Sequence, residues 1–438
     1  MKKIVLATLC VFINQINIYA QEDQYLINAY YNQLHTNSTI LQNTIDHSIE
    51  LDALGKHIAD ARIVLLGEPS HGDGGAIRYK TELVKYLYKN KNFDVLLFEA
   101  DFYSIQKGIQ ESSNKNLKEQ LEANIYTCWS TSPVSQELWD FYNQNRKSKR
   151  PLVIGGFDIR HAGNYAKNNL EKDLQELFTK IHFNLSHDYK NTFFTDLKYV
   201  LDNEFKIDRQ KLKNEKGLYD VLNSLHEKLS FSELNSKDRT FWLIAIENLK
   251  GNLDVMIHNK NRDIAMAKTF LAIAKYMYPG KKIMVWSHNN HNVLDVHTYL
   301  NSDDKAAKDW YQNNTYESFS YFGAELYREL KNEIYSLAIT SGKGNYSPYF
   351  FGTDYFHADL SKQAKIVPSG INSLEAFLET KTDDSPLFIP LPKAQGKPSG
   401  YPKFAARLLD LNYELKLDYT SAFNGIIYLP TTVDLKNN

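Results

Sequence analysis

The chain contains 438 residues, enough for one or two domains with a large hydrophobic core. Aromatic residues make up 13% of it, with 29 tyrosines and 23 phenylalanines, which excludes a disordered or low-complexity protein. The 51 lysines and arginines are balanced by 52 aspartates and glutamates, so the composition lacks the basic character that indicates a nucleic-acid partner. We therefore expect a globular protein that does not bind nucleic acid.

The first residues have the pattern of a secretory signal peptide over residues 1–20. Lys2 and Lys3 form a basic start, residues 4–13 form an almost uninterrupted apolar run, and cleavage is expected after Ala20. The alternative is a buried N-terminal helix. No other segment has the run of about 18 apolar residues that a membrane span needs. We therefore expect a periplasmic or secreted protein without membrane contact after cleavage.

Removal of the signal leaves Cys128 as the only cysteine of the mature chain. A single cysteine forms neither an intramolecular disulfide nor a cysteine-rich metal site. A chain of this length is stabilised by its core alone. We expect Cys128 to be a buried structural residue, with a nucleophilic cysteine as the alternative.

Strand-like and helix-like stretches alternate from residue 62 onward, a pattern typical of an α/β fold. Residues 62–67 form a short apolar run, residues 76–89 have apolar side chains at helical spacing, and residues 94–99 form a second apolar run. This order predicts a βαβ unit with parallel strands and a right-handed crossover. Further strands are expected at residues 152–157, 282–286 and 334–339, with an edge strand at 425–430 that ends at its proline.

Residues 163–278 form a long, charge-rich stretch with helical character, and its last helix ends at Pro279 and Gly280. This length far exceeds a simple crossover connection. We therefore expect a helical subdomain or lid inserted into the sheet domain. The predicted fold is a mostly parallel central sheet flanked by helices, with this insertion, in one domain over residues 21–438.

Acidic and histidine residues follow four of the predicted strands. In open α/β sheets, ligands bind at the carboxyl ends of the strands. Parallel strands would bring these side chains to one edge of the sheet, which predicts a functional site there. The alternative is a structural role for each residue, because acidic side chains also cap helices and accept hydrogen bonds from the backbone of loops. In chain order the residues are Glu68 and His71, Glu99, Asp158, and His288 with His291.

The residue types suit hydrolysis by activated water. Histidine is a base near neutral pH, and a neighbouring carboxylate such as Glu68 or Glu99 fixes its tautomer. Donors such as Arg78, His288 or His291 can stabilise a developing oxyanion. The two histidines are three residues apart, so they share a face if a helical turn begins there. The alternative is that both are core histidines bonded to backbone.

An enzyme nucleophile and a metal ion are the rival interpretations. The loop Gly67–Gly72 is not the G-x-S-x-G motif, because it has one residue too many before Ser70, so we favour activated water over a serine nucleophile. Three histidines with carboxylates also match zinc or iron ligand chemistry. The sequence lacks the specific H-E-x-x-H motif, and the spacing alone leaves a metal site open.

At these positions the sequence resembles the erythromycin esterase family. The resemblance covers roughly residues 40–345 and preserves the order of the motifs. Weaker agreement occurs at Trp129, at residues 139–143 and at Gly323-x-x-Leu326. The main motifs are Gly67-Glu68-x-Ser70-His71, Phe98-Glu99, Gly156-x-Asp158, Arg262-Asp263-x-x-Met266-Ala267 and His288-Asn289-x-His291.

The resemblance implies a hydrolase that opens a macrolactone ester without a metal or other cofactor. It assigns His71 as the general base that activates water. Its implied substrate-binding positions are Ser70, Trp129 and Asp158. The residues that it implies position water and substrate, or stabilise the intermediate, are Glu68, Arg78, Glu99, His288 and His291.

Two features depart from the macrolide-resistance members. The spacing from His71 to Arg78 is shorter, and the chain carries an export signal. The family also resembles a wider group of Gly-x-x-His proteins that includes metal-dependent peptidases and a haem-binding protein. The alternatives are therefore a metal-dependent hydrolase or peptidase, and a non-catalytic protein that binds haem or another small molecule.

Overall fold

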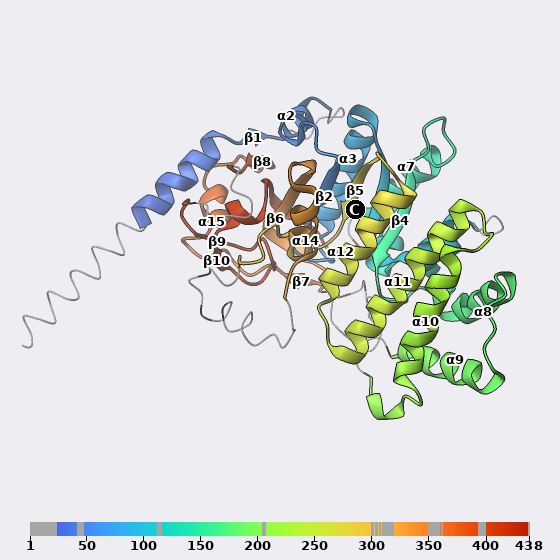
Figure 1. Ribbon diagram of the computed structural model, residues 1–438. Coiled ribbons are helices and arrows are strands. Elements are labelled where there is room, and N and C mark those ends of the chain that lie inside the picture. Colours follow the sequence, from blue (N-terminus) through green and yellow to red (C-terminus); the bar gives the residue numbers. More distant parts are fainter. Residues whose placement is uncertain are drawn as a thin grey trace, which may run out of the picture.

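The computed structural model describes residues 24–41, 48–111, 116–203, 207–298, 319–348, 362–392 and 400–436, together with the single residues 302, 305, 308 and 360 (Figure 1). The expected signal peptide at residues 1–20 lies outside the described residues. Within the described part of the chain, no helix is both long and apolar enough to cross a membrane.

Among the described residues, six parallel strands form the centre of one sheet, in the order β11-β6-β2-β5-β3-β4. Ile63 and Leu65 of β2 point to one face of the sheet, and Val64 and Leu66 point to the other. Because both faces are covered, these strands are continuous apolar runs. They are β2 (Ile63–Leu66), β3 (Phe93–Asp101), β4 (Val153–Asp158), β5 (Lys282–Trp286), β6 (Ile334–Tyr346) and β11 (Gly425–Thr432).

A strand at residues 425–430 was predicted to lie at the edge of the sheet and to end at its proline, and both parts of this prediction are wrong. β11 lies between β6 and β8, parallel to the first and antiparallel to the second, and it continues to Thr432. Its pairing with β8 ends at Tyr428, so Pro430 lies where β11 has a partner on one side only. A proline without an N–H is tolerated in such a place. The remaining strands are β1 (Thr39–Ile40), β7 (Ala364–Lys365), β8 (Leu387–Pro390) and the separate pair β9 (Phe404–Ala406) with β10 (Leu415–Leu417).

One face of the sheet is covered by helices from the first half of the chain. Leu54, Val84 and Leu138 from these helices pack in one core with Val64 and Met284 from the strands. Helix α3 begins where the Asp73 carboxylate accepts the Ala76 N–H at 2.9 Å. The helices are α2 (Ser48–Ile58), α3 (Gly74–Lys91), α5 (Leu117–Asn124), α6 (Thr127–Ser130) and α7 (Gln136–Asn145). The short α4 (Phe102–Ile105) follows β3, and its Phe102 and Tyr103 belong to the core on the opposite face.

The predicted helical region covers the opposite face, beside β4 in Figure 1. Its Leu170, Leu249 and Phe270 share a core with Ile63 and Val285 of the sheet. The region therefore packs directly on the strands that carry the candidate residues. Its helices are α8 (Asn164–Lys180), α9 (His187–Asp202), α10 (Glu215–Ser230), α11 (Ser236–His258) and α12 (Arg262–Ala272), and α14 (Phe322–Leu330) follows later in the chain.

A third core lies over β11 and β8. It joins a helix at residues 24–36 to the C-terminal elements, with Tyr31, Leu378 and Tyr419 among its buried side chains. These elements gather at one side of the molecule in Figure 1, in red and orange. They include α15 (Leu374–Glu379) and α16 (Tyr419–Ala422).

Candidate active site

The four strands expected to carry the site are neighbours in the sheet, in the order β2-β5-β3-β4. Glu68 follows β2, Glu99 lies near the end of β3, and Asp158 is the last residue of β4. His288 and His291 follow β5, in a segment whose 3₁₀ turn spans Asn289–Asn292. The parallel pairing therefore brings these side chains to one sheet edge, as the sequence predicted.

Two glycines in the loop after β2 allow backbone and side chains to approach closely. A Cβ on Gly67 would lie 1.9 Å from Oδ1 of Asn289, and a Cβ on Gly72 would lie 1.6 Å from the carbonyl oxygen of Ser347. The Ser347 N–H in turn donates to the Gly72 carbonyl at 2.9 Å. Glycine is required at both positions because any side chain would overlap these neighbours. The loop that carries Glu68 and His71 is thus fixed from both ends.

Glu68 is fully buried and holds three partners. One oxygen, Oε2, lies 2.6 Å from Nζ of Lys80, and the other, Oε1, lies 2.7 Å from Nδ1 of His71. Trp129 donates its indole N–H to Oε1 at 3.2 Å. Burial alone would raise the pKa of Glu68, but the Lys80 ammonium and the His71 contact outweigh it and lower that pKa. Glu68 is therefore a carboxylate.

This contact fixes the tautomer of His71. An ionised carboxylate only accepts hydrogen bonds, so Nδ1 of His71 must carry the proton that it donates to Glu68. The lone pair of the neutral imidazole then lies on Nε2. Trp129 packs its ring against the imidazole in a T-shaped contact at 5.1 Å, and the His288 ring lies 5.3 Å away. His71 thus has the arrangement of a base that is oriented by a carboxylate.

Lys80 belongs to the site, although it was not selected from the sequence. It is fully buried on α3, and its Nζ lies 4.2 Å from the centre of the Trp286 ring. Burial lowers the pKa of Lys80, although the negative charge of Glu68 acts to raise it. The available signal was helical spacing: Lys80 lies three residues after Ile77 and four before Val84, on the buried face of α3.

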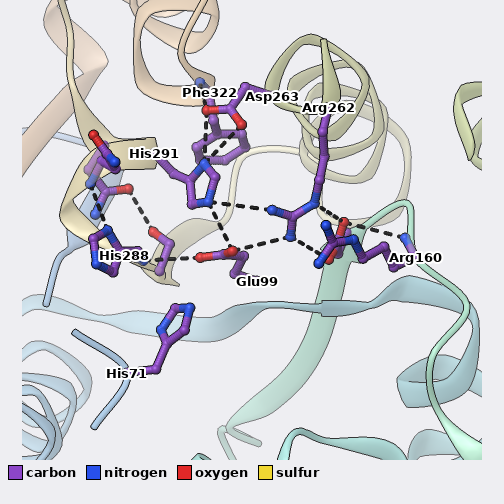
Figure 2. A network of polar contacts seen from close by, with 12 residues as sticks. His71, Glu99, Arg160, Arg262, Asp263, His288, His291 and Phe322 are labelled. Carbon is purple, nitrogen blue, oxygen red and sulfur yellow. Dashed lines mark hydrogen bonds and ion pairs between the residues drawn. The ribbon is translucent and has the colours of Figure 1, made fainter. Parts of the chain in front are cut away.

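His291 contacts a carboxylate with each ring nitrogen, as Figure 2 shows. Its Nδ1 lies 2.8 Å from Oδ2 of Asp263, and its Nε2 lies 3.0 Å from Oε1 of Glu99. Burial alone would lower the pKa of His291, but the two carboxylates outweigh it and raise that pKa to about 10. Both nitrogens therefore carry protons, and His291 is a cation and not a base.

His288 is held in the opposite state. Its Nδ1 accepts the backbone N–H of Asn290 at 3.1 Å, and its Nε2 donates to the carbonyl oxygen of Pro69 at 3.0 Å. Burial, together with the positive charge of His291, lowers the pKa of His288 to about 3. The ring is neutral, and it holds the backbone of the loop that carries His71. The two histidines share a turn but do not face one common ion.

Arg262, at the start of α12, connects two of the strand ends. Its guanidinium donates to both oxygens of Asp158, at 3.0 and 2.5 Å, and to Oε1 of Glu99 at 3.2 Å. Arg262 and Asp263 were seen in the sequence only as part of the family motif, without an assigned role. Both residues come from the helical region, and its position on the sheet could not be predicted from the sequence.

Three other predicted residues lie around this network with different contacts. Ser70 accepts the Gly72 N–H with its hydroxyl at 3.2 Å, which closes the turn of the loop. Arg78 is partly exposed and lies two residues before Lys80 on α3, on another face of the helix. Cys128 is buried, and burial raises its pKa well above its usual range, as expected for a structural cysteine.

The charges around these residues bear on the metal alternative. In the parts of the chain that the structure describes, no group of three or more His, Cys, Asp and Glu side chains is arranged to hold a metal ion. Lys80 and Arg262 occupy carboxylate oxygens of Glu68 and Asp158 that a metal would need. The nitrogens of His288 are already bonded to backbone. As they are paired here, these described side chains therefore do not form a donor set that fits a metal centre.

The family model described as erythromycin esterase matches residues 88–434, most of the chain. The chain belongs to the erythromycin esterase family. It is also 27% identical over 319 residues to YbfO of Bacillus subtilis (strain 168), whose name classes it among the hydrolases. That match covers 67% of this chain and 68% of YbfO. As a member of this family, the chain is a hydrolase.

Solved structures show the same fold at lower identity. A Bacillus cereus protein matches with a TM-score of 0.69 at 16% identity, over 93% of this chain and 98% of its own. A mutant of the erythromycin esterase EreC in its open conformation matches with a TM-score of 0.61 at 16% identity, over 90% and 97% of the two chains. The esterase-like fold, with its helical insertion, is therefore confirmed.

Proposed function

We propose that the chain hydrolyses a carboxylic ester, with an erythromycin-type macrolide lactone as the leading substrate, by water that His71 activates without a metal. The observation that carries the proposal is the orientation of His71 by Glu68. The carboxylate is buried and accepts the Nδ1 proton, so the lone pair of the imidazole, which would take a proton from water, lies on Nε2. The family membership supports an ester as the substrate class.

The proposed reaction has two steps. Water gives one proton to Nε2 of His71 while its oxygen attacks the carbonyl carbon of the ester, which forms a tetrahedral intermediate. The carbon–oxygen bond to the alcohol then breaks, and the imidazolium returns its proton to the leaving oxygen. The products are an acid and an alcohol, joined in one opened chain if the substrate is a lactone. Glu68 stays ionised and stabilises the imidazolium between the steps.

Fixed positive charge near the sheet edge supports the same proposal. Side-chain exposure is 18% for His291 and 16% for Arg262, whereas Lys80 has none. Of these three cations, His291 and Arg262 are therefore the ones that a developing negative charge on the substrate can approach. Positive groups held in place before the reaction stabilise an oxyanion strongly in a site shielded from water.

A direct test incubates an erythromycin-class lactone with the purified protein, with and without a chelator, and follows the products by mass spectrometry. We expect a gain of one water in both samples. Loss of hydrolysis in the chelated sample, together with stoichiometric zinc, manganese or iron in the untreated protein, would instead support the metal-dependent hydrolase. Binding of haem or another small molecule without turnover of any ester would support the non-catalytic alternative.

We also propose that the protein is exported to the periplasm or secreted. The support is the basic start and apolar run within residues 1–20. N-terminal sequencing of protein recovered from a host with a secretion pathway tests the proposal. A mature chain that begins at Gln21 is expected, and a cell-retained chain that still begins at Met1 would contradict it.

A further inference from the structure

Asp263 lies at the start of α12 and contacts two other parts of the fold, the segment after β5 and the start of α14. Its Oδ1 and Oδ2 lie 2.9 and 2.8 Å from Nδ1 of His291, after β5. Its Oδ2 also accepts the backbone N–H of Phe322 at 3.0 Å, where α14 begins. In Figure 2 the Asp263 carboxylate lies on one side of the His291 ring and Glu99 lies on the other. The ring is thus placed between two carboxylates from different elements.

We propose that Asp263 is a positioning residue that keeps His291 protonated on both ring nitrogens, so that His291 serves the reaction as a fixed cation. The geometry requires this state, because a carboxylate accepts a proton from each nitrogen at 2.8 and 3.0 Å. The kinetic part of the inference rests on the proposed function, whereas the protonation state does not.

The titratable and charged groups around His291 come from α12, from β3 and from its own segment. Asp263 on α12 and Glu99 on β3 favour the cation. Nη1 of Arg262 lies 3.5 Å from Nε2 of His291 and opposes the cation, but Glu99 is closer, at 3.0 Å. His288 lies three residues before His291 and is neutral. The carboxylates therefore determine the charge of the ring.

Contacts continue from His291 to the loop of the proposed base. Glu99 contacts His291 with one oxygen and accepts the backbone N–H of His288 at 3.1 Å with the other. The ring of His288 then donates to Pro69, beside the loop residues Glu68 and His71. One carboxylate on α12 thus connects the helical region to the loop through ordered polar contacts.

The test measures the protonation of His291 directly. Protein labelled with ¹⁵N-histidine is titrated by NMR between about pH 6 and pH 9, the range in which an ordinary histidine loses its charge. The signal is assigned by its loss in His291→Gln. We expect the wild-type ring to stay an imidazolium over this range. In Asp263→Asn the pKa of His291 should fall by about one to three units, the effect of removing an adjacent opposite charge.

Two further variants separate charge from structure. Asp263→Glu restores the carboxylate and should return the pKa of His291 toward the wild-type value. Asp196→Asn is the matched control, because Asp196 is buried and accepts the N–H groups of Lys213 and Asn214 at 2.9 and 2.7 Å within the helical region. It should leave the His291 signal unchanged.

The kinetic arm uses lactone hydrolysis. In Asp263→Asn, the dependence of the rate on pH should gain an ionisation that the wild type and Asp196→Asn lack. A wild-type His291 that loses its charge below about pH 8 would overturn the inference, whether or not the variants fold. So would an unchanged pKa in Asp263→Asn. If no ester is hydrolysed while His291 stays an imidazolium, the proposed function fails and the assignment of Asp263 stands.

Discussion

Nζ of Lys80 lies 2.6 Å from Oε2 of Glu68, and neither side chain is exposed to solvent. Because both side chains are buried, each charge depends on the other. The same carboxylate holds His71 with its second oxygen. Lys80 therefore supports the proposed base, His71, through the Glu68 carboxylate that both residues contact.

Lys80→Met should destabilise the fold by about 3–5 kcal/mol, because it leaves Glu68 buried without its partner. Adding Glu68→Gln to this variant should recover much of that loss, since the double variant has no uncompensated charge. Denaturant unfolding of the single and double variants measures the coupling. Lys198→Met is the control, because Lys198 pairs with Asp202 at the surface and its loss should cost less than about 1 kcal/mol. Additive single effects of Lys80 and Glu68 would contradict the interdependence.

Trp129→Phe tests the hydrogen bond to Glu68. The substitution removes the indole N–H that donates to Oε1 at 3.2 Å and keeps an aromatic ring near His71. A hydrogen bond to a charged group is worth about 1.5–3 kcal/mol, so kcat should fall by roughly tenfold or more with little change in KM. A raised KM at constant kcat would instead favour the substrate-binding role that the sequence predicted. Trp242→Phe, in the helical region, serves as the control.

The charge of His291 should also be visible in the stability of the fold. Its pKa is raised from about 6.5 in the unfolded chain to about 10 in the folded protein. The contribution of His291 to the free energy of unfolding is therefore fully present below about pH 6.5 and is lost as the pH rises through 10. Denaturant unfolding between these values should show a decline in stability that His291→Gln reduces. Equal slopes in the two proteins would contradict the raised pKa.

Gly72→Ala should impair both folding and activity. The added Cβ would lie 1.6 Å from the Ser347 carbonyl oxygen, so the loop or its neighbour must move. Forced overpacking costs about 1–3 kcal/mol, and the movement displaces His71, which immediately precedes Gly72 in the loop. Thermal unfolding and lactone hydrolysis measure the two effects. Gly251→Ala, where the nearest atom is the Ala265 Cβ at 3.2 Å, should be far milder.

The positions of the central strands could be predicted because parallel strands buried on both faces are continuous apolar runs. The same patterns placed Glu68, Glu99 and Asp158 at strand ends, and the structure brings these ends together. The order of strands is a long-range property that no local pattern contains. For this reason β11 was expected at the sheet edge although it lies between β6 and β8.

The roles of Lys80 and of the residues at the start of α12 could not be predicted from the sequence. Lys80 has the spacing of the buried face of α3, but a lysine among apolar residues is ordinarily read as exposed. Arg262 and Asp263 reach the site only because α12 packs beside the sheet, more than a hundred residues after β4 begins. The charge states of His288 and His291 follow from partners brought together by the fold.

The central claim is that His71 is the base of a metal-free ester hydrolysis. The most direct measurement compares wild type and His71→Ala on an erythromycin-class lactone, at matched concentration of folded protein and in the presence of chelator, by mass spectrometry. We predict a gain of one water with the wild type and none above background with His71→Ala. Equal hydrolysis by the two proteins would contradict the claim.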